Sequence, residues 1–296
     1  MKIVICNDGS AQAENAVKYT ALIAGPCQAE VTLLGIVEHE GQQAELAKKL
    51  QASRELLQGL NIPTQTSLRT GEPIAEIIRY TTESACDLVV LGAVRKGTRG
   101  AFWMSAKAYK LIKGILQPAL AVIGNPAALR RILICSGGRP QIEKGIEFTG
   151  SIAKCCGAEV TLVHVMPDLP AIYPSLIQRQ ENVEALLRSS SNLGRNLRRE
   201  KELLESQGIK TNIKIRDGEV IGELLAEVRS GNYDMVVAGS SISGGPLQTY
   251  IMGDVTREIV NRADCPVLVT RGEAAKPERF GGFFSHIFGA KEKEEK

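Results

Sequence analysis

The sequence predicts a repeated α/β fold, in which two doubly wound parallel sheets follow one another along the chain. Three observations carry this prediction. The segment AEVTL occurs at 29–33 and again at 158–162. Short apolar runs alternate with amphipathic helical patterns in both parts of the chain. The length of 296 residues is about twice the ~150 residues of a typical domain. Duplication of one whole domain explains the length and the pattern together.

The repeat extends from the first predicted strand to the last. IVIC at 3–6 matches ILIC at 132–135, and the offset in numbering between them is the same as between the two AEVTL segments. DLVVLG at 87–92 matches DMVVAG at 234–239 at a larger offset, so the second copy carries an insertion before this motif. We therefore predict domains at 1–127 and 128–272, followed by a tail at 273–296.

Within the first copy, strands are predicted at 2–6, 31–37, 88–91 and 119–123, because these apolar runs end at Gly, Pro, Asn or Asp. The helices between them have apolar faces at helical spacing, and Pro73 is suited to the first turn of one of them. The insertion, around 168–208, is expected to add one extended helix with Leu186, Leu193, Leu197 and Leu204 on one side.

Composition excludes several classes of protein. Lys and Arg exceed Asp and Glu by only three residues, too few to predict nucleic-acid binding. The longest uncharged stretch, 235–253, contains Gly, Ser and Pro, so no integral membrane span is expected. No signal peptide is apparent at the start of the chain. The seven cysteines include no C-x-x-C pair, which favours a reducing, cytoplasmic location.

Several short motifs occur in a characteristic order. The first strand ends in NDGS at 7–10, TGEP follows at 70–73, and then DLVVLG at 87–92. The second copy has GE at 218–219, DMVVAG at 234–239 and CPVLV at 265–269. This order and spacing resembles the universal stress protein family, in a tandem form that covers roughly 1–124 and 130–271. The resemblance implies a five-stranded sheet of order 3-2-1-4-5 in each domain, of the adenine nucleotide α-hydrolase-like class. It also implies that the two domains pack as an internal pseudo-dimer through their last strands.

The resemblance implies a site for ATP or AMP at the carboxyl ends of the strands. In nucleotide-binding members a loop G-x-x-G-x9-G-[ST] binds the phosphates, because glycines let backbone N–H groups approach them. Asp8 would hold the adenosine side of a site built around Asp8, Ser10 and Gly92, with Arg95 or Ser105 on the phosphates. Asp8 and Ser10 could instead cap the next helix. The loop begins at Gly92, but Arg95 and Ser105 stand where glycines are expected. Arg95 could bind an anion by its charge, or belong to a solvated basic loop.

The corresponding loop of the second copy departs differently. It keeps glycines at Gly239, Gly244, Gly245 and Gly253. Asp254 follows the last of these and would repel phosphate, so this loop has either a weak phosphate affinity or a purely structural role. Gly137 takes the place of Asp8. The features of the family's nucleotide site are thus divided between the two copies.

Two hypotheses for function remain open. In the first, the protein is a non-enzymatic stress-response protein with degenerate nucleotide loops that acts by binding a ligand or a protein partner. In the second, it is an ATP or AMP sensor that uses the Asp8 site. Slow ATP hydrolysis or adenylation is a further alternative, but the sequence shows no Ser/His/Asp or Cys/His pattern and no zinc-ligand spacing. We expect no enzyme activity and no metal.

Two further features have open interpretations. Four of the six phenylalanines lie in the tail, at 280, 283, 284 and 288. The tail is predicted to dock on the protein itself, on an unknown protein partner or on a membrane surface. Cys155 and Cys156 are adjacent on a predicted buried helix, where oxidation sensing and inert thiols are the two readings. A homodimer of the tandem chain is also considered.

Overall fold

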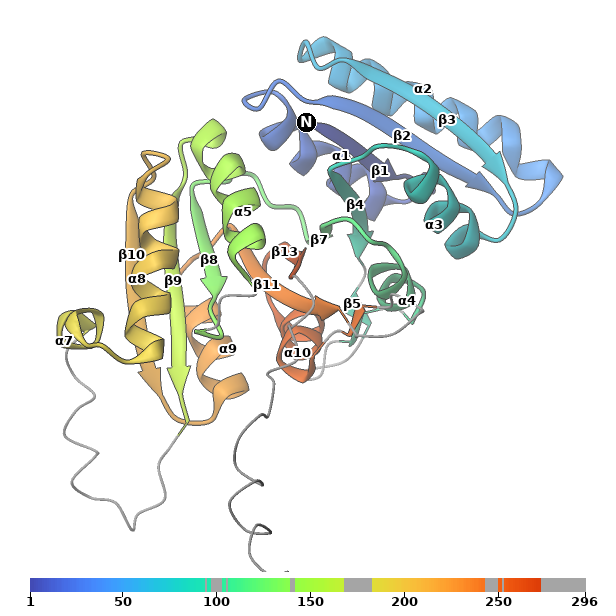
Figure 1. Ribbon diagram of the computed structural model, residues 1–296. Helices are drawn as coiled ribbons and strands as arrows, with labels where there is room; N and C mark the ends of the chain where they lie inside the picture. Colours follow the sequence, from blue (N-terminus) through green and yellow to red (C-terminus); the bar gives the residue numbers. More distant parts are fainter. Residues whose placement is uncertain are drawn as a thin grey trace, which may run out of the picture.

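The computed structural model describes residues 1–93, 95–96, 103–104, 106–138, 142–167, 183–242, 250–251 and 253–272. Two α/β halves lie side by side and share one sheet (Figure 1). The first repeat consists of β1 (Lys2–Cys6), α1 (Ala11–Ala24), β2 (Glu30–Val37), η1 (Glu40–Gln42), α2 (Gln43–Gly59), β3 (Thr64–Thr70), α3 (Pro73–Glu83), β4 (Leu88–Ala93), β5 (Arg95–Lys96), β6 (Trp103–Met104), α4 (Ala106–Gly114) and β7 (Ala119–Ile123). The second repeat consists of β8 (Arg131–Cys135), α5 (Glu143–Cys156), β9 (Glu159–Met166), α7 (Val183–Arg188), α8 (Asn192–Glu205), β10 (Thr211–Asp217), α9 (Val220–Ser230), β11 (Met235–Ile242), β12 (Tyr250–Ile251), α10 (Asp254–Arg262) and β13 (Val267–Arg271).

The strand order confirms the predicted fold class. The sheet runs β10-β9-β8-β11-β13-β7-β4-β1-β2-β3, so each half has the order 3-2-1-4-5. Neighbouring strands within each half of this path are parallel, whereas β7 and β13 are antiparallel, with Leu120 opposite Leu268. The last strands of the two repeats therefore join the two predicted sheets into one, as expected for an internal pseudo-dimer.

The insertion in the second repeat does not form the single extended helix that its leucines predict. Helix α7 ends at Arg188 and α8 begins at Asn192. The serines between them provide the reason: Ser191 Oγ accepts a hydrogen bond from Gly194 N at 3.0 Å, and Ser189 Oγ donates to Leu186 O at 2.7 Å. Serine hydroxyls compete with the helical backbone and cap new helices, so the prediction of one continuous helix was wrong.

The Gly-Glu motif that recurs in the two repeats has a simple structural basis. Gly71 and Gly218 adopt φ angles of 146° and 134°, a region that residues with a Cβ rarely enter. The glutamate that follows caps the next helix: Glu72 accepts a hydrogen bond from Ala75 N at 2.7 Å, and Glu219 accepts one from Gly222 N at 2.6 Å. The glycine makes the turn and the glutamate starts the helix.

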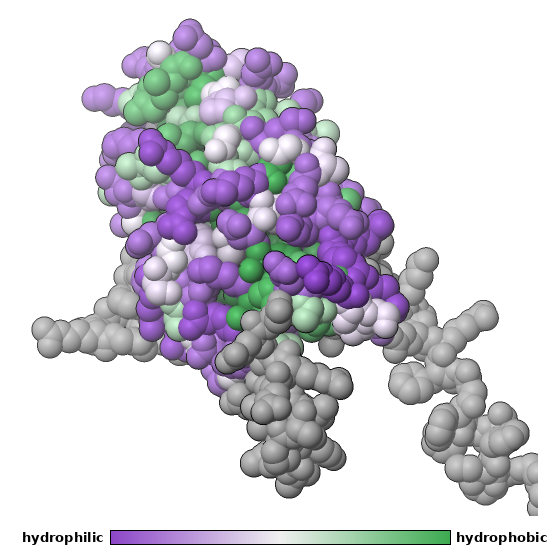
Figure 2. Space-filling view, turned by 90° about the vertical axis from the view of Figure 1, so that its left-hand side faces the viewer, coloured by the Kyte–Doolittle hydropathy of each residue, from purple (hydrophilic) through white to green (hydrophobic). Residues whose placement is uncertain are grey.

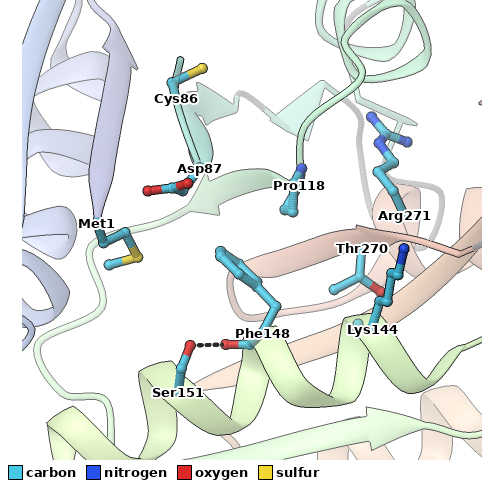
Figure 3. A pocket seen from close by; sticks show the side chains of 10 residues that line it. Met1, Cys86, Asp87, Pro118, Lys144, Phe148, Ser151, Thr270 and Arg271 are labelled. Carbon is cyan, nitrogen blue, oxygen red and sulfur yellow. Dashed lines mark hydrogen bonds between the residues drawn. The ribbon is translucent and has the colours of Figure 1, made fainter.

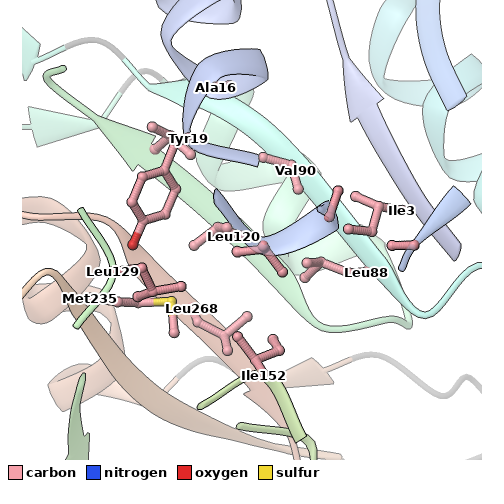
Figure 4. Close-up of a cluster of buried hydrophobic side chains, with 14 of the residues drawn as sticks. Ile3, Ala16, Tyr19, Leu88, Val90, Leu120, Leu129, Ile152, Met235 and Leu268 are labelled. Carbon is pink, nitrogen blue, oxygen red and sulfur yellow. The ribbon is translucent and has the colours of Figure 1, made fainter. Parts of the chain in front are cut away.

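Both repeats contribute to one apolar cluster that passes through their interface (Figure 4). Tyr19 of α1 is fully buried there, and its hydroxyl donates to the carbonyl oxygen of Asp234 in the second repeat at 2.9 Å. Arg271, 8% exposed, donates from the second repeat to the carbonyl oxygens of Gln117, at 3.0 Å, and Ile112 in the first. The interface between the repeats is thus part of the protein core.

The outer surface differs from this interior. The face that carries α8 and β10 shows mostly hydrophilic side chains, with apolar ones gathered in separate patches (Figure 2). Across the described part of the chain, no helix is both long enough and apolar enough to cross a membrane.

Candidate functional site

A cavity of about 340 Å³ lies at the carboxyl ends of β1, β2 and β4 in the first repeat, bordered by α3 and α4. Aliphatic side chains, such as Ile77 and Leu111, form part of its wall. The polar residues that line it are Asn7, Asp8, Ser10, Gln12, Glu38 and Lys107. An apolar cavity with a few polar groups at this edge of a parallel sheet is a typical small-molecule site.

The turn after β1 presents Asp8 and Ser10 to this cavity. Gly9 has a φ angle of 74°, which lets the chain turn sharply between them. Asp8 Oδ1 accepts a hydrogen bond from Ser10 N at 2.9 Å, and Ser10 Oγ accepts one from Ala13 N at 3.2 Å. Ser10 therefore caps α1, as considered from the sequence, whereas Asp8 closes the turn before the helix; both residues also line the cavity.

Gly92 lines the same cavity, but packing gives a sufficient reason for a glycine there. A Cβ at this position would lie 2.4 Å from the backbone carbonyl group of Gln12. Strand β4 thus passes directly against the start of α1. The start of α1, with Gln12 and Ala13, therefore lies next to β4 where both line the cavity.

Lys107 and Glu38 face each other at the cavity and were not singled out in the sequence. Lys107 Nζ lies 3.8 Å from Glu38 Oε1, and the two side chains are 71% and 44% exposed. An exposed pair at this distance contributes little to stability, so Lys107 is available to an anionic ligand group. Glu38 directly follows β2, and the rule that ligands bind at strand carboxyl ends would have pointed to it. Nothing in the sequence pattern marks Lys107.

The equivalent turn of the second repeat has no carboxylate. Ser136 Oγ accepts a hydrogen bond from Gly138 N at 3.0 Å, and Gly137 stands where the first repeat has Asp8. Helix α5 starts at Glu143, and Ile142 before it offers no side-chain cap. The turn is kept here, but Gly137 provides no carboxylate like that of Asp8.

The remaining glycines predicted for the second repeat lie away from Asp8. A Cβ on Gly239 would lie 3.3 Å from the side chain of Ile142, and one on Gly253 would meet open space. Asp254 is exposed at the start of α10, 3.1 Å from Arg257. The structure thus brings Asp8, Ser10 and Gly92 to one cavity and leaves Gly239 and Gly253 in the other repeat.

Several positions predicted for the ligand site or for docking lie outside the residues that the structure describes. Ser105, Gly244, Gly245 and the tail at 273–296 lie outside the described residues, and of Arg95 only the backbone, in β5, is described. Their predicted roles stay predictions.

The family model described as Universal stress protein family matches residues 1–122 and 128–271. The chain belongs to the universal stress protein family. A universal stress protein of Methanocaldococcus jannaschii is 24% identical over 142 residues, which cover 48% of this chain and 82% of that protein. The crystal structure of a universal stress protein from Archaeoglobus fulgidus has a TM-score of 0.70 at 16% identity, covering 91% of this chain and 98% of its own. A family member from Arabidopsis thaliana, solved with AMP bound, has a TM-score of 0.34 at 13% identity, covering 42% of this chain and 92% of its own.

A larger cavity, of about 510 Å³, opens where the two universal stress protein repeats meet. Phe148 and Ser151 of α5 point into it, toward Met1 and Pro118 of the first repeat (Figure 3). Phe148 occupies the position in the second repeat that Tyr19 occupies in the first, at the offset that relates IVIC to ILIC. Asp8, Ser10, Gly92, Gly239 and Gly253, the predicted ligand-binding residues that the structure describes, are not among the residues that line this cavity.

One thiol, that of Cys6, is among the described residues that line the Asp8 cavity. Burial, helped by Cys86 and Asp8, raises the pKa of the Cys6 thiol beside the Asp8 cavity to about 12, so this thiol stays protonated at neutral pH. Among the described residues, no group of three or more His, Cys, Asp or Glu side chains is placed to hold a metal ion.

Proposed function

We propose that this universal stress protein acts in the stress response as a non-enzymatic binding protein, and that the cavity beside Asp8 is its ligand site. The observation that carries the proposal is the meeting of Asp8, Ser10 and Lys107 around one cavity at the carboxyl ends of the strands. Its volume of about 340 Å³ falls within the range of small-molecule sites, roughly 300–1,000 Å³.

An adenine nucleotide, AMP or ATP, is the ligand that this arrangement favours. The Asp8 carboxylate can accept hydrogen bonds from ribose hydroxyls, and the aliphatic walls suit the flat base. Lys107 supplies the positive charge that a phosphate requires. This charge takes the place of the glycine-rich backbone that the family's loop would provide.

The absence of an enzymatic role is inferred from the groups around the cavity. No histidine is among the described residues that line it, and the thiol of Cys6 is held protonated by burial. Histidine is the side chain that most often performs acid–base catalysis at neutral pH, and a cysteine nucleophile acts as its thiolate. We infer that the ligand is bound and released without chemical change.

One ligand per chain is expected, because Gly137 of the second repeat carries no carboxylate. Calorimetric titration with AMP and ATP, with and without Mg²⁺, tests this stoichiometry. Asp8→Ala should weaken binding at least about tenfold, the effect of losing one hydrogen bond to a charged group. Asp8 is exposed, so the thermal midpoint without ligand should change little.

Gly137→Ala is the matched control, since it alters the equivalent turn of the second repeat where a Cβ meets open space. It should leave the affinity unchanged. Lys107→Ala should weaken AMP binding but not adenosine binding. Unaltered AMP affinity in Asp8→Ala, or two ligands per chain, would contradict the assignment of the site.

A further inference from the structure

Two cysteines occupy equivalent positions in the two repeats. Cys27 and Cys156 are related by the same offset in numbering as β1 and β8, or α1 and α5. Each directly precedes a residue in the left-handed region, Gln28 with φ of 49° and Gly157 with φ of 64°. The same local turn therefore presents a thiol at the end of the first helix in each repeat.

These two turns meet at the interface between the repeats. Helices α1 and α5 contact each other. Cys156 Sγ donates a hydrogen bond to Leu22 O at 3.5 Å, while Cys27 N bonds to the next carbonyl along, Ile23 O, at 3.0 Å. Both cysteine side chains are half-buried against the apolar cluster that the repeats share. Equivalent residues approach each other only near a twofold axis, so the two thiols mark the pseudo-twofold axis of the molecule.

The thiols also affect one another's ionisation. A hydrogen bond from Cys27 lowers the pKa of Cys156, and the same bond raises the pKa of Cys27. Cys155, the neighbour of Cys156, is exposed; partial burial and the nearby Cys27 raise its pKa to about 11. Of the three, Cys156 is the one whose thiolate is favoured, and the thiolate is the form that peroxides attack.

We propose that Cys27 and Cys156 form an oxidation site, at which a hydroperoxide joins the two repeats by a disulfide across the pseudo-twofold axis. The Cys156 thiolate attacks the peroxide O–O bond and becomes a sulfenic acid, and hydrogen peroxide releases its second oxygen as water once it takes up a proton. The Cys27 sulfur then attacks the sulfenic sulfur, and the Cys27 proton leaves with the displaced hydroxyl group as a second water. Two thiols are oxidised and one peroxide is reduced.

A second pair of equivalent cysteines provides an internal control. Cys6 and Cys135 are related by the same offset, but they lie on β1 and β8, two strands separated in the sheet by β4, β7, β13 and β11. Burial raises the pKa of each thiol to about 12. Equivalence in the repeat is therefore not sufficient: the two cysteines must also meet at the interface between the repeats.

The test is to treat the reduced full-length protein with a few equivalents of hydrogen peroxide and to digest it with trypsin without reductant. Cleavage after Lys18 and Lys154 gives peptides 19–48 and 155–179, which contain Cys27 and the Cys155–Cys156 pair. We expect these two peptides joined, with a mass two hydrogens below their sum, and the joined species to disappear on reduction. The oxidised protein should also have a higher thermal midpoint than the reduced protein, because the bond closes a long loop in the unfolded chain.

Single-serine variants assign the bond. Cys155→Ser should still give the joined peptides, whereas Cys27→Ser and Cys156→Ser should not, and circular dichroism of each variant confirms that it is folded. Joined peptides that require Cys155, a bond within peptide 155–179, a disulfide between two chains, or sulfinic acid without any joining would each overturn the proposal. None of the three cysteines lines the Asp8 cavity, so the result is independent of nucleotide binding.

Discussion

The turn after β1 contacts α2 in the first repeat, and the turn after β8 contacts α8 in the second. These two places, called here the first and the second corner, contain equivalent residues with different chemistry. Ser53 and Glu200 are related by the offset of the DLVVLG and DMVVAG motifs, and Asn7 and Ser136 by the offset of IVIC and ILIC. In the first corner, Asn7 Nδ2 donates to Ser53 Oγ at 3.1 Å. In the second, Glu200 is 2% exposed, and neither of its carboxylate oxygens has a hydrogen-bond partner among the described residues. The same place in the fold therefore holds a hydrogen-bonded neutral pair in the first repeat. In the second repeat it holds a buried carboxyl group whose oxygens have no hydrogen-bond partner among the described residues.

The cost of the second arrangement is visible in the protonation of Glu200. Burial raises its pKa to about 7, the nearby Ser136 hydroxyl opposes the rise, and Glu143 adds to it. Glu227, in the same repeat, is equally buried but accepts hydrogen bonds from Lys214, Arg216 and Tyr233 at 2.7 to 2.8 Å. Burial raises the pKa of Glu227 as well, but those three hydrogen bonds together outweigh it and bring the pKa below its usual value. Partners, rather than depth, decide whether a buried carboxylate stabilises the protein.

The largest difference between the repeats is expected at the equivalent glycines within β4 and β11, the fourth strand of each half. Gly92→Ala would place a Cβ 2.4 Å from the Gln12 backbone, whereas Gly239→Ala would place one 3.3 Å from the flexible Ile142 side chain. Backbone cannot yield as a side chain can, so we expect a loss of about 3 kcal/mol for Gly92→Ala and less than about 1 kcal/mol for Gly239→Ala. Urea unfolding of the two variants measures both. Equal losses would show that the two helix starts approach their strands equally closely.

The sequence predicted the architecture because that information is repeated and local. The duplicated motifs gave the two halves, and each Gly-Glu pair marks a turn and a helix cap whose requirements are set within a few residues. The burial of Glu200 without hydrogen-bond partners could not be predicted, because it depends on the packing of α8 against the β8 turn across the insertion. For the site, Asp8 and Ser10 were found through the strand they follow. Lys107 was missed, because it reaches the cavity from a helix whose sequence shows no motif.

The next largest effect is expected for Glu200→Gln, and it should depend on pH. The pKa of Glu200 in the folded state is raised from 4.5 to about 7. The contribution of this carboxyl group to the free energy of unfolding is therefore fully present below about pH 4.5. That contribution is lost as the pH rises through 7, because the folded protein must then bury a charge. The neutral glutamine does not incur this loss, and we expect it to gain on the order of 2–3 kcal/mol above pH 8 and little at pH 4.

Glu227→Gln is the matched control, because it removes the charge from an equally buried position that has its partners. That variant should lose stability at neutral pH rather than gain it. Thermal or urea unfolding between pH 4 and pH 9 distinguishes the two. A Glu200→Gln gain that does not change with pH would mean that the carboxyl group has the same pKa in the folded and unfolded states, so that packing rather than charge is responsible for the gain.

The smallest predicted effect concerns the interface between the repeats, where equivalent aromatic residues again differ. Tyr19 is fully buried and donates to Asp234 O at 2.9 Å, whereas Phe148 is half-buried beside the 510 Å³ cavity. Tyr19→Phe removes the donor from a buried carbonyl and should cost about 1 kcal/mol, the usual contribution of such a bond. Phe148→Tyr adds a hydroxyl next to open space that water can reach, so its effect should stay within about 0.5 kcal/mol. If Tyr19→Phe proved as neutral as Phe148→Tyr in urea unfolding, the hydrogen bond between the repeats would add nothing to their packing, and the apolar cluster alone would hold the two halves together on that side of the axis.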